Sequence, residues 1–103
     1  MDSHTTTKQD ELDYIKDKLS MASRLECLAE EASELAQSAL KTARILRNEN
    51  PTPVTLGEAK KSLIEEFTDV CLSADMAEVS HKDVIYDMKL HRCYNRVKYH
   101  RMG

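Results

Sequence analysis

Apolar residues recur at steps of three and four along the middle of the chain, which is the spacing of an amphipathic helix. We expect one long helix from residue 23 to about Arg47. Ser23 and Glu26 predict its start, because they have the spacing of a capping box, in which two side chains bind free backbone N–H groups of the first turn. The predicted apolar stripe consists of Leu25, Leu28, Ala32, Leu35, Ala39, Ala43 and Leu46.

A second long helix is expected after a proline-containing loop. Residues 48–53 include Pro51 and Pro53, and each proline lacks a backbone N–H and disfavours helical angles in the residue before it. Thr55 and Glu58 have the spacing of another capping box, which predicts a helix to about Val79. Its apolar stripe consists of Ala59, Leu63, Phe67, Val70, Ala74 and Ala77.

Shorter helices are expected on either side of this pair. Leu12, Ile15 and Leu19 have helical spacing and predict a helix over about residues 10–20. Residues 80–83 resemble a weaker cap and predict a fourth helix to about Tyr99, with apolar positions that include Val84, Met88, Tyr94 and Val97. The polar N-terminus predicts a disordered tail over residues 1–9, followed by a single domain over residues 10–103.

The composition favours an all-α fold. The chain has 103 residues, which suits one domain, and only two Gly and two Pro, which are few for the many turns of a β fold. We therefore predict an all-α, four-helix, bundle-like domain. Because a domain of this size buries only about two-thirds of the surface of its unfolded chain, we also expect a partner subunit, in a homodimer or homotetramer.

Charge and cysteine content narrow the functional classes. A formal net charge of −3 disfavours a protein that coats nucleic acid, which needs an excess of Lys and Arg. The sequence shows no apolar run suited to a secretory signal or a membrane span, so we expect a cytoplasmic protein without a membrane partner. Cys27, Cys71 and Cys93 lack metal-ligand spacing, and we interpret them as buried thiols in a reducing compartment.

Two acidic pairs lie beside the apolar stripes of the long helices. Glu31 and Glu34 are three residues apart, as are Glu66 and Asp69, so each pair lies on one face of its helix. If the helices pack antiparallel, the four carboxylates converge and repel one another unless a cation is present, and hard oxygen ligands favour Mg²⁺ or Mn²⁺. An ordinary solvated acidic face explains the same pattern equally well.

The residues around these pairs resemble a known family. Two segments, LAEEASEL over residues 28–35 and LIEEFTDV over residues 63–70, are similar to the signature of the MazG-like nucleotide pyrophosphatases, an all-α family. The resemblance extends from about Leu12 to Arg96. The stretch between Glu34 and Glu66 is longer than is usual in the family, and the proline-containing loop absorbs the excess and could alter access of the substrate.

The resemblance implies hydrolysis of a nucleoside triphosphate between its α and β phosphates, with Mg²⁺ as the cofactor and a monophosphate and pyrophosphate as products. It also implies a substrate-binding Lys and Arg on the fourth helix, a role that fits Lys89 and Arg92. Glu30 and Glu65 either assist the neighbouring carboxylates or are exposed helix formers. Metal binding and catalysis are implied for four residues: Glu31, Glu34, Glu66 and Asp69.

Two other functions stay open. The chain could be a non-catalytic interaction or regulatory module with the same fold, or a relative that hydrolyses a phosphoribosyl-nucleotide intermediate. The sequence contains no Gly-rich phosphate loop and no Ser-His-Asp or Cys-His arrangement, so we expect neither a P-loop mechanism nor a nucleophilic triad.

Overall fold

The structure is a computed structural model that describes residues 5–49 and 53–99. Within these ranges the chain forms no strand and has four helices: α1 (Lys8–Lys18), α2 (Met21–Arg47), α3 (Leu56–Met76) and α4 (Asp83–Lys98). The all-α prediction is therefore confirmed. None of the helices in the described part of the chain combines the length and apolar composition needed to cross a bilayer.

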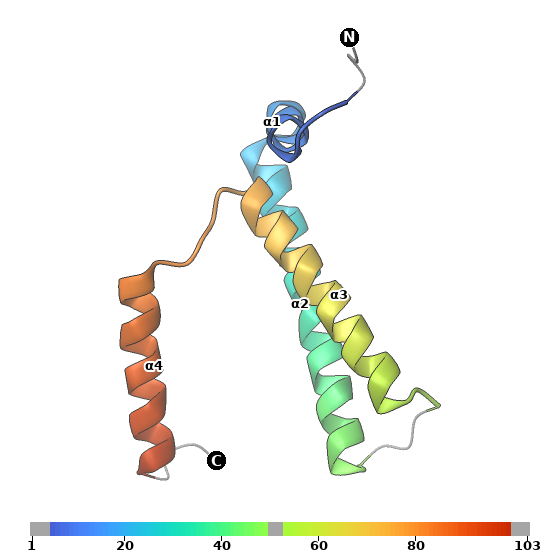
Figure 1. Cartoon of the computed structure of the whole chain (residues 1–103), viewed down its shortest axis with the longest axis vertical. Helices are drawn as coiled ribbons and strands as arrows, with labels where there is room; N and C mark the ends of the chain where they lie inside the picture. The colour runs from blue at the N-terminus through green and yellow to red at the C-terminus, as the bar shows by residue number, and fades with distance from the viewer. Residues whose placement is uncertain (1–4, 50–52, 100–103) are drawn as a thin grey trace.

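Helices α2 and α3 form an antiparallel hairpin (Figure 1). Helix α1 lies across the end of this hairpin where α2 begins and α3 ends, and it contacts α3. Helix α4 stands apart from the hairpin, joined to α3 by residues 77–82, and none of its residues is buried. The chain is accordingly extended, because its radius of gyration is 18.3 Å whereas about 13 Å is typical of a compact domain of about 100 residues.

Helix α1 begins earlier than the sequence predicts. The hydroxyl of Thr7 accepts a 3.0 Å hydrogen bond from the backbone N–H of Asp10, whose carboxylate accepts a 3.1 Å bond from the backbone N–H of Thr7. This capping box starts the helix at Lys8. The prediction of a disordered tail over residues 1–9 is therefore wrong for Lys8 and Gln9, and residues 1–4 lie outside the described part of the chain.

Helix α2 also begins before its predicted position. Ser20 has an extended backbone, and its hydroxyl accepts a 3.1 Å hydrogen bond from the backbone N–H of Ser23. The predicted capping box at Ser23 is wrong because Ser23 lies inside the first turn, which starts at Met21. The helix ends at Arg47 as predicted, and Asn48 follows in the left-handed region with a φ of 55°.

The capping box predicted for α3 is confirmed. The hydroxyl of Thr55 accepts a hydrogen bond from the N–H of Glu58, and the carboxylate of Glu58 accepts one from the N–H of Thr55, both at 3.1 Å. Helix α3 ends at Met76, before the predicted Val79, because Glu78 adopts a left-handed conformation with a φ of 59°. Of the loop predicted over residues 48–53, residues 50–52 lie outside the described ranges.

The N-terminus of α4 differs from the prediction. The expected cap over residues 80–83 is wrong, because Lys82 occupies the capping position and its side chain makes no capping hydrogen bond. The helix runs to Lys98, and Tyr99 follows as its C-terminal cap.

The contact between α2 and α3 follows a regular seam. In each helix the seam positions alternate between steps of three and four, as in paired helices of a bundle, and all are buried or half-buried. The α2 seam consists of Arg24, Leu28, Glu31, Leu35, Ser38, Thr42 and Ile45. The α3 seam consists of Leu56, Ala59, Leu63, Glu66, Val70, Ser73 and Ala77.

The α2 seam is rotated away from the predicted apolar stripe, whereas the α3 seam keeps four of the six predicted positions, namely Ala59, Leu63, Val70 and Ala77. The α2 stripe shares only Leu28 and Leu35 with the seam, and Phe67, a predicted core residue of α3, is 57% exposed. Polar residues occupy four of the seven α2 seam positions in place of apolar ones. Thr42, for example, is 5% exposed and donates a 2.8 Å hydrogen bond to the carbonyl of Ser38.

The prediction that the cysteines are buried is wrong. Cys27 is half-buried, whereas Cys71 and Cys93 are exposed. Cys71 lies on α3 outside the seam, and Cys93 lies on α4, where no residue is buried. The hairpin of a single chain therefore provides no core that covers these two thiols.

Candidate metal centre

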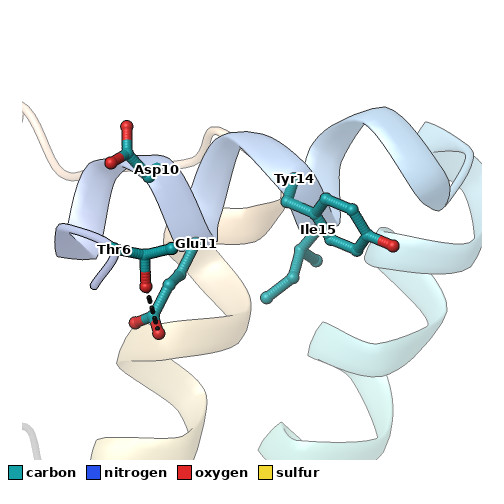
Figure 2. Close-up of a pocket in the computed structure, with 5 residues that line it drawn as sticks. All are labelled: Thr6, Asp10, Glu11, Tyr14 and Ile15. Carbon is teal, nitrogen blue, oxygen red and sulfur yellow. Dashed lines mark hydrogen bonds between the residues drawn. The ribbon is translucent and has the colours of Figure 1, made fainter. Parts of the chain in front are cut away.

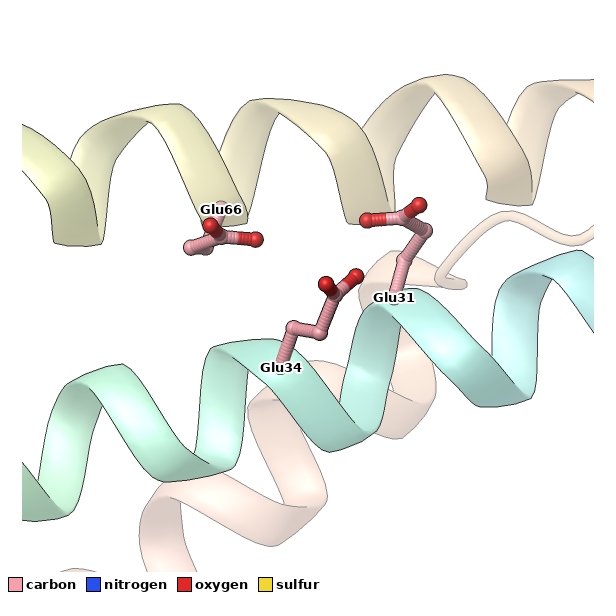
Figure 3. A group of neighbouring side chains, drawn as sticks. All are labelled: Glu31, Glu34 and Glu66. Atoms are coloured by element: carbon pink, nitrogen blue, oxygen red, sulfur yellow. The ribbon is translucent and has the colours of Figure 1, made fainter.

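Three of the four predicted carboxylates converge between α2 and α3 (Figure 3). Glu31 and Glu34 project from α2 towards α3, and Glu66 projects from α3 into the same space. Each of the three offers an oxygen within 4.8 Å of the other two. Oxygens at this separation can bind one cation, or two ions that share ligands.

The register of the hairpin brings these residues together. Arg24 Nη1 donates a 2.7 Å hydrogen bond to the backbone carbonyl of the last residue of α3. Glu31 lies seven residues along α2 from Arg24, and Asp69 lies seven residues back along α3. Because both helices rise by about 1.5 Å per residue, the same register places Glu34, three residues further along α2, level with Glu66.

Glu31 has the least favourable environment for a negative charge. Its side chain is half-buried, and its Oε2 atom is shielded from solvent without a hydrogen-bond partner among the described residues. Burial raises the pKa of Glu31 above its ordinary value of 4.5, and the adjacent Glu34 carboxyl and the charges of Asp69 and Glu66 raise the pKa further.

Glu66 is in a similar position on the facing helix. Burial raises the pKa of this carboxyl, and the charges of Glu34, Asp69 and Glu65 add to the effect. In the described ranges, no Lys, Arg or His forms an ion pair with any of the three clustered carboxylates. Half-buried charges of one sign are costly unless an opposite charge offsets them. The cluster therefore has the electrostatic character of a cation site.

The set of donor atoms fits a hard divalent cation. Mg²⁺ and Mn²⁺ prefer carboxylate oxygens, and Mg²⁺ usually combines one or two protein carboxylates with waters and the phosphates of a substrate. The structural observation that fits such an ion is the shielded Oε2 atom of Glu31, which has no hydrogen-bond partner in the described part of the chain. Glu31, Glu34 and Glu66 are the residues that could hold it.

Asp69, the fourth predicted ligand, lies at the rim of the cluster. It is exposed, and it does not belong to the group whose oxygens lie within 4.8 Å of one another. Its charge is nevertheless near enough to raise the pKa of both Glu31 and Glu66.

The single chain does not bring the predicted substrate-binding residues to the carboxylates. Lys89 and Arg92 are exposed on α4, which stands apart from the hairpin (Figure 1). Glu30 and Glu65 are exposed beside the cluster, and the charge of Glu65 contributes to the raised pKa of Glu66. The structure thus assembles the predicted acidic part of the site and leaves the predicted basic part separate.

A hollow on α1 lies away from the carboxylates (Figure 2). The hydroxyl of Thr6 donates a 2.9 Å hydrogen bond to the carboxylate of Glu11 at its edge. The lining residues, which include none of the predicted metal ligands, are Thr6, Asp10, Glu11, Tyr14 and Ile15. The hollow therefore forms no part of the candidate site.

Known proteins give no further guide to the chemistry. Comparisons with protein-family models, curated proteins and solved structures found no match to this chain.

Arg24 is the structurally important residue near the site that the sequence pattern failed to indicate. It is only 8% exposed, and it lay inside a predicted helix cap, where an arginine normally faces solvent. Its place in the three-and-four repeat that continues through Leu28 and Glu31 is the signal that could have identified it. Its hydrogen-bond partners are the carbonyls of Leu19 and Met76 and the carboxylate of Glu78.

Proposed function

We propose that this protein is a Mg²⁺-dependent nucleoside triphosphate pyrophosphohydrolase that cleaves the bond between the α and β phosphates. The observation that carries the proposal is the carboxylate cluster between α2 and α3, in which the half-buried Glu31 has a raised pKa and forms no ion pair with a described Lys, Arg or His. The resemblance of the segments around Glu31 and Glu66 to MazG-like pyrophosphatases supports the same activity.

Glu31, Glu34 and Glu66 would hold the ion, and Asp69 adds negative charge at the rim. When bound there, Mg²⁺ neutralises charge on phosphate oxygens and lowers the pKa of a coordinated water. A carboxylate must be ionised to bind a metal ion. Because the pKa of Glu31 is raised, cation binding should release a proton at pH values close to that pKa.

Lys89 and Arg92 are the proposed partners of the substrate phosphates. A guanidinium binds phosphate oxygens through two parallel hydrogen bonds, and an ammonium group does so as a point charge. This role requires α4 to lie closer to the carboxylates than it does in the single chain (Figure 1).

Product analysis tests the proposal. Protein freed of metal by a chelator is incubated, with and without Mg²⁺, with a panel of ribonucleotides and deoxynucleotides of all common bases and with a phosphoribosyl nucleotide. We expect a nucleoside monophosphate and pyrophosphate in equal amounts, and only with Mg²⁺. Release of orthophosphate from the triphosphates would show cleavage of a different bond. Turnover of the phosphoribosyl nucleotide alone would assign the protein to the other substrate class.

Matched variants separate the cluster from the rest of the acidic surface. We expect Glu31→Gln and Glu66→Gln each to reduce kcat/KM by about 100-fold or more, since each removes a charged ligand of the catalytic ion. Glu26→Gln is the control, because Glu26 is an exposed carboxylate of α2 outside the cluster. Absence of turnover with every nucleotide, together with no effect of Mg²⁺ on stability, would favour the non-catalytic interaction module.

A further inference from the structure

Lys41 is a cation on the same helix as two of the clustered carboxylates. It follows Glu34 by seven residues along α2, which is a distance of about 10 Å towards the proline-containing loop. Seven residues make nearly two full turns, so Lys41 lies within about 20° of Glu34 around the helix axis. Lys41 is exposed. The hairpin itself therefore presents a positive charge beyond the cluster, without any movement of α4.

Ser62 lies between the cluster and Lys41 on the facing helix. Glu34 and Asp69 each follow a seam glutamate by three positions, so in the antiparallel hairpin both lie on the same side. Ser62 precedes Asp69 by seven residues and lies on that side too, about 6 Å from Glu66 along α3 in the direction of the loop. This side of the hairpin therefore changes from carboxylates to a hydroxyl and then to an ammonium group.

The charge of Lys41 is not used within the described part of the chain. The described ion pairs do not include Lys41. None of the residues three or four positions away along α2 is acidic, so no ion pair within the helix can form. These residues are Gln37, Ser38, Arg44 and Ile45. Lys41 also precedes the last turn of α2, so stabilisation of the helix dipole does not account for its charge.

The backbone of α2 directs the Lys41 side chain towards the cluster. In an α-helix each Cα–Cβ bond tilts towards the N-terminus, and long side chains follow that direction. For Lys41 this is the direction of Glu34. The tilt shortens the separation between the ammonium group and an ion held by the carboxylates, and the remaining gap suits a short polyphosphate.

We propose that Lys41 binds the terminal phosphate of a nucleoside triphosphate whose polyphosphate extends from the cation towards the proline-containing loop. This inference rests on the proposed function and adds the orientation of the substrate. Water attacks the α phosphorus, the bond from that phosphorus to the bridging oxygen breaks, and the oxygen leaves with pyrophosphate. Lys41 offsets the negative charge of this leaving group, and the Ser62 hydroxyl can donate to one of its oxygens.

Lys8 is the competing cation at the other end of the cluster. It lines a hollow between α1 and α3 together with Leu72, which follows Asp69 by one helical turn in the direction away from the loop. The same hollow is lined by Glu11 and Asp75, whose carboxylates offset the charge of Lys8. We therefore assign the terminal phosphate to Lys41.

Product inhibition tests this orientation, because the two products contain different parts of the substrate. Pyrophosphate contains the β and γ phosphates, whereas the monophosphate contains the α phosphate and the nucleoside. We expect Lys41→Ala to raise the inhibition constant of pyrophosphate at least about 10-fold, since a hydrogen bond from a charged group is lost, and to leave that of the monophosphate unchanged. An equal change in both constants, or a change in neither, would overturn the proposal.

Lys60→Ala is the matched control. Lys60 is exposed at nearly the same level of the hairpin as Lys41, but it follows the seam residue Ala59 by one position, a rotation of about 100° that leads to the opposite side. It should leave both inhibition constants unchanged. Lys8→Ala tests the reverse orientation, and a selective loss of pyrophosphate inhibition in that variant instead of Lys41→Ala would also overturn the proposal.

Calorimetry of pyrophosphate binding gives the same comparison without turnover. With the protein saturated with Mg²⁺, Lys41→Ala should weaken pyrophosphate binding at least about 10-fold and keep the Tm of the parent protein, since Lys41 is exposed. No binding of pyrophosphate by the unaltered protein would contradict the assignment of Lys41. Binding that depends on Lys41 in a protein that hydrolyses no nucleotide would contradict only the proposed function, whereas hydrolysis with a pyrophosphate affinity independent of Lys41 would contradict only this inference.

Discussion

The guanidinium of Arg24 donates a 2.7 Å hydrogen bond to the backbone carbonyl of Met76 and so joins the start of α2 to the end of α3. The same group donates a 3.1 Å bond to the carbonyl of Leu19 at the end of α1 and forms a 3.3 Å ion pair with Glu78. One side chain therefore holds three helix ends in register. That register determines which residues of α2 and α3 face each other further along the hairpin.

Replacement of Arg24 by alanine should lower the free energy of unfolding by about 2 to 3 kcal/mol, because hydrogen bonds from a charged group are lost and two carbonyls lose a donor. Denaturant unfolding at a fixed protein concentration measures the change. Arg47→Ala is the control, since Arg47 is exposed in the last turn of α2 and should contribute less than about 1 kcal/mol. Equal effects of the two substitutions would show that Arg24 does not hold the helix ends together.

Removal of one charge from the cluster should stabilise the metal-free protein. In a chelator at neutral pH we expect Glu31→Gln to raise the Tm, because the half-buried charge and its repulsion by Glu34, Asp69 and Glu66 disappear. Mg²⁺ should raise the Tm of the unaltered protein by several degrees and leave that of Glu31→Gln nearly unchanged. Thermal melts with and without Mg²⁺ measure both effects. A variant that stays as responsive to Mg²⁺ as the parent protein would contradict the assignment of Glu31 as a ligand.

The rise in Tm caused by Glu31→Gln should become larger as the pH increases. The pKa of Glu31 is raised in the folded state, so the protonated carboxyl favours folding below about pH 4.5, and this contribution is lost as pH rises through the raised pKa. The difference in Tm between Glu31→Gln and the parent should therefore be small at pH 4.5 and grow towards neutral pH. Paired thermal melts in chelator-containing buffers measure this difference in Tm. A difference that shrinks with rising pH would show that the pKa of Glu31 is not raised in the folded state.

Glu58 should have the opposite dependence on pH. Its carboxylate accepts a hydrogen bond from the backbone N–H of Thr55, and this bond is the main cause of the lowered pKa of Glu58. A hydrogen bond with the Thr55 hydroxyl lowers the pKa further. A lowered pKa contributes stability above the ordinary value of 4.5 that is lost as pH falls through the folded-state pKa. We expect Glu58→Ala to destabilise the protein at pH 7 more than at pH 3, as measured by thermal melts. An equal loss at both pH values would mean that the charged cap is not the source of the effect.

Local signals in the sequence predicted which segments form helices better than they predicted which faces of those helices pack together. The capping box at Thr55 and Glu58 was legible because both partners lie within one turn and need no tertiary context. Ser23 and Glu26 have the same spacing, yet Ser20 starts the helix there, because the sharp turn after α1 exposes its hydroxyl to the first free N–H groups. Two candidate caps three residues apart cannot be ranked from the pattern alone.

The convergence of the acidic residues and most of the α3 seam were predictable, whereas the α2 seam was not. Glu31 and Glu66 have helical spacing to Glu34 and Asp69, and an antiparallel pairing brings three of the four together. On α2 the predicted core followed apolar residues, whereas the real seam passes through Arg24, whose partners lie at the C-terminal ends of α1 and α3. Periodicity could have placed Arg24 in the seam, but it does not reveal which atoms at the ends of α1 and α3 its guanidinium binds.

We propose that Glu31, Glu34 and Glu66 together bind a divalent cation. Electron paramagnetic resonance of added Mn²⁺ tests it directly, since bound Mn²⁺ loses the sharp signal of the free ion. We expect the metal-free protein to bind Mn²⁺ and Mg²⁺ to displace the bound Mn²⁺. Glu31→Gln and Glu66→Gln should each weaken Mn²⁺ binding at least about 10-fold, whereas Glu26→Gln should leave it unchanged. Equal binding by all four proteins, or no binding by the unaltered one, would contradict this proposal.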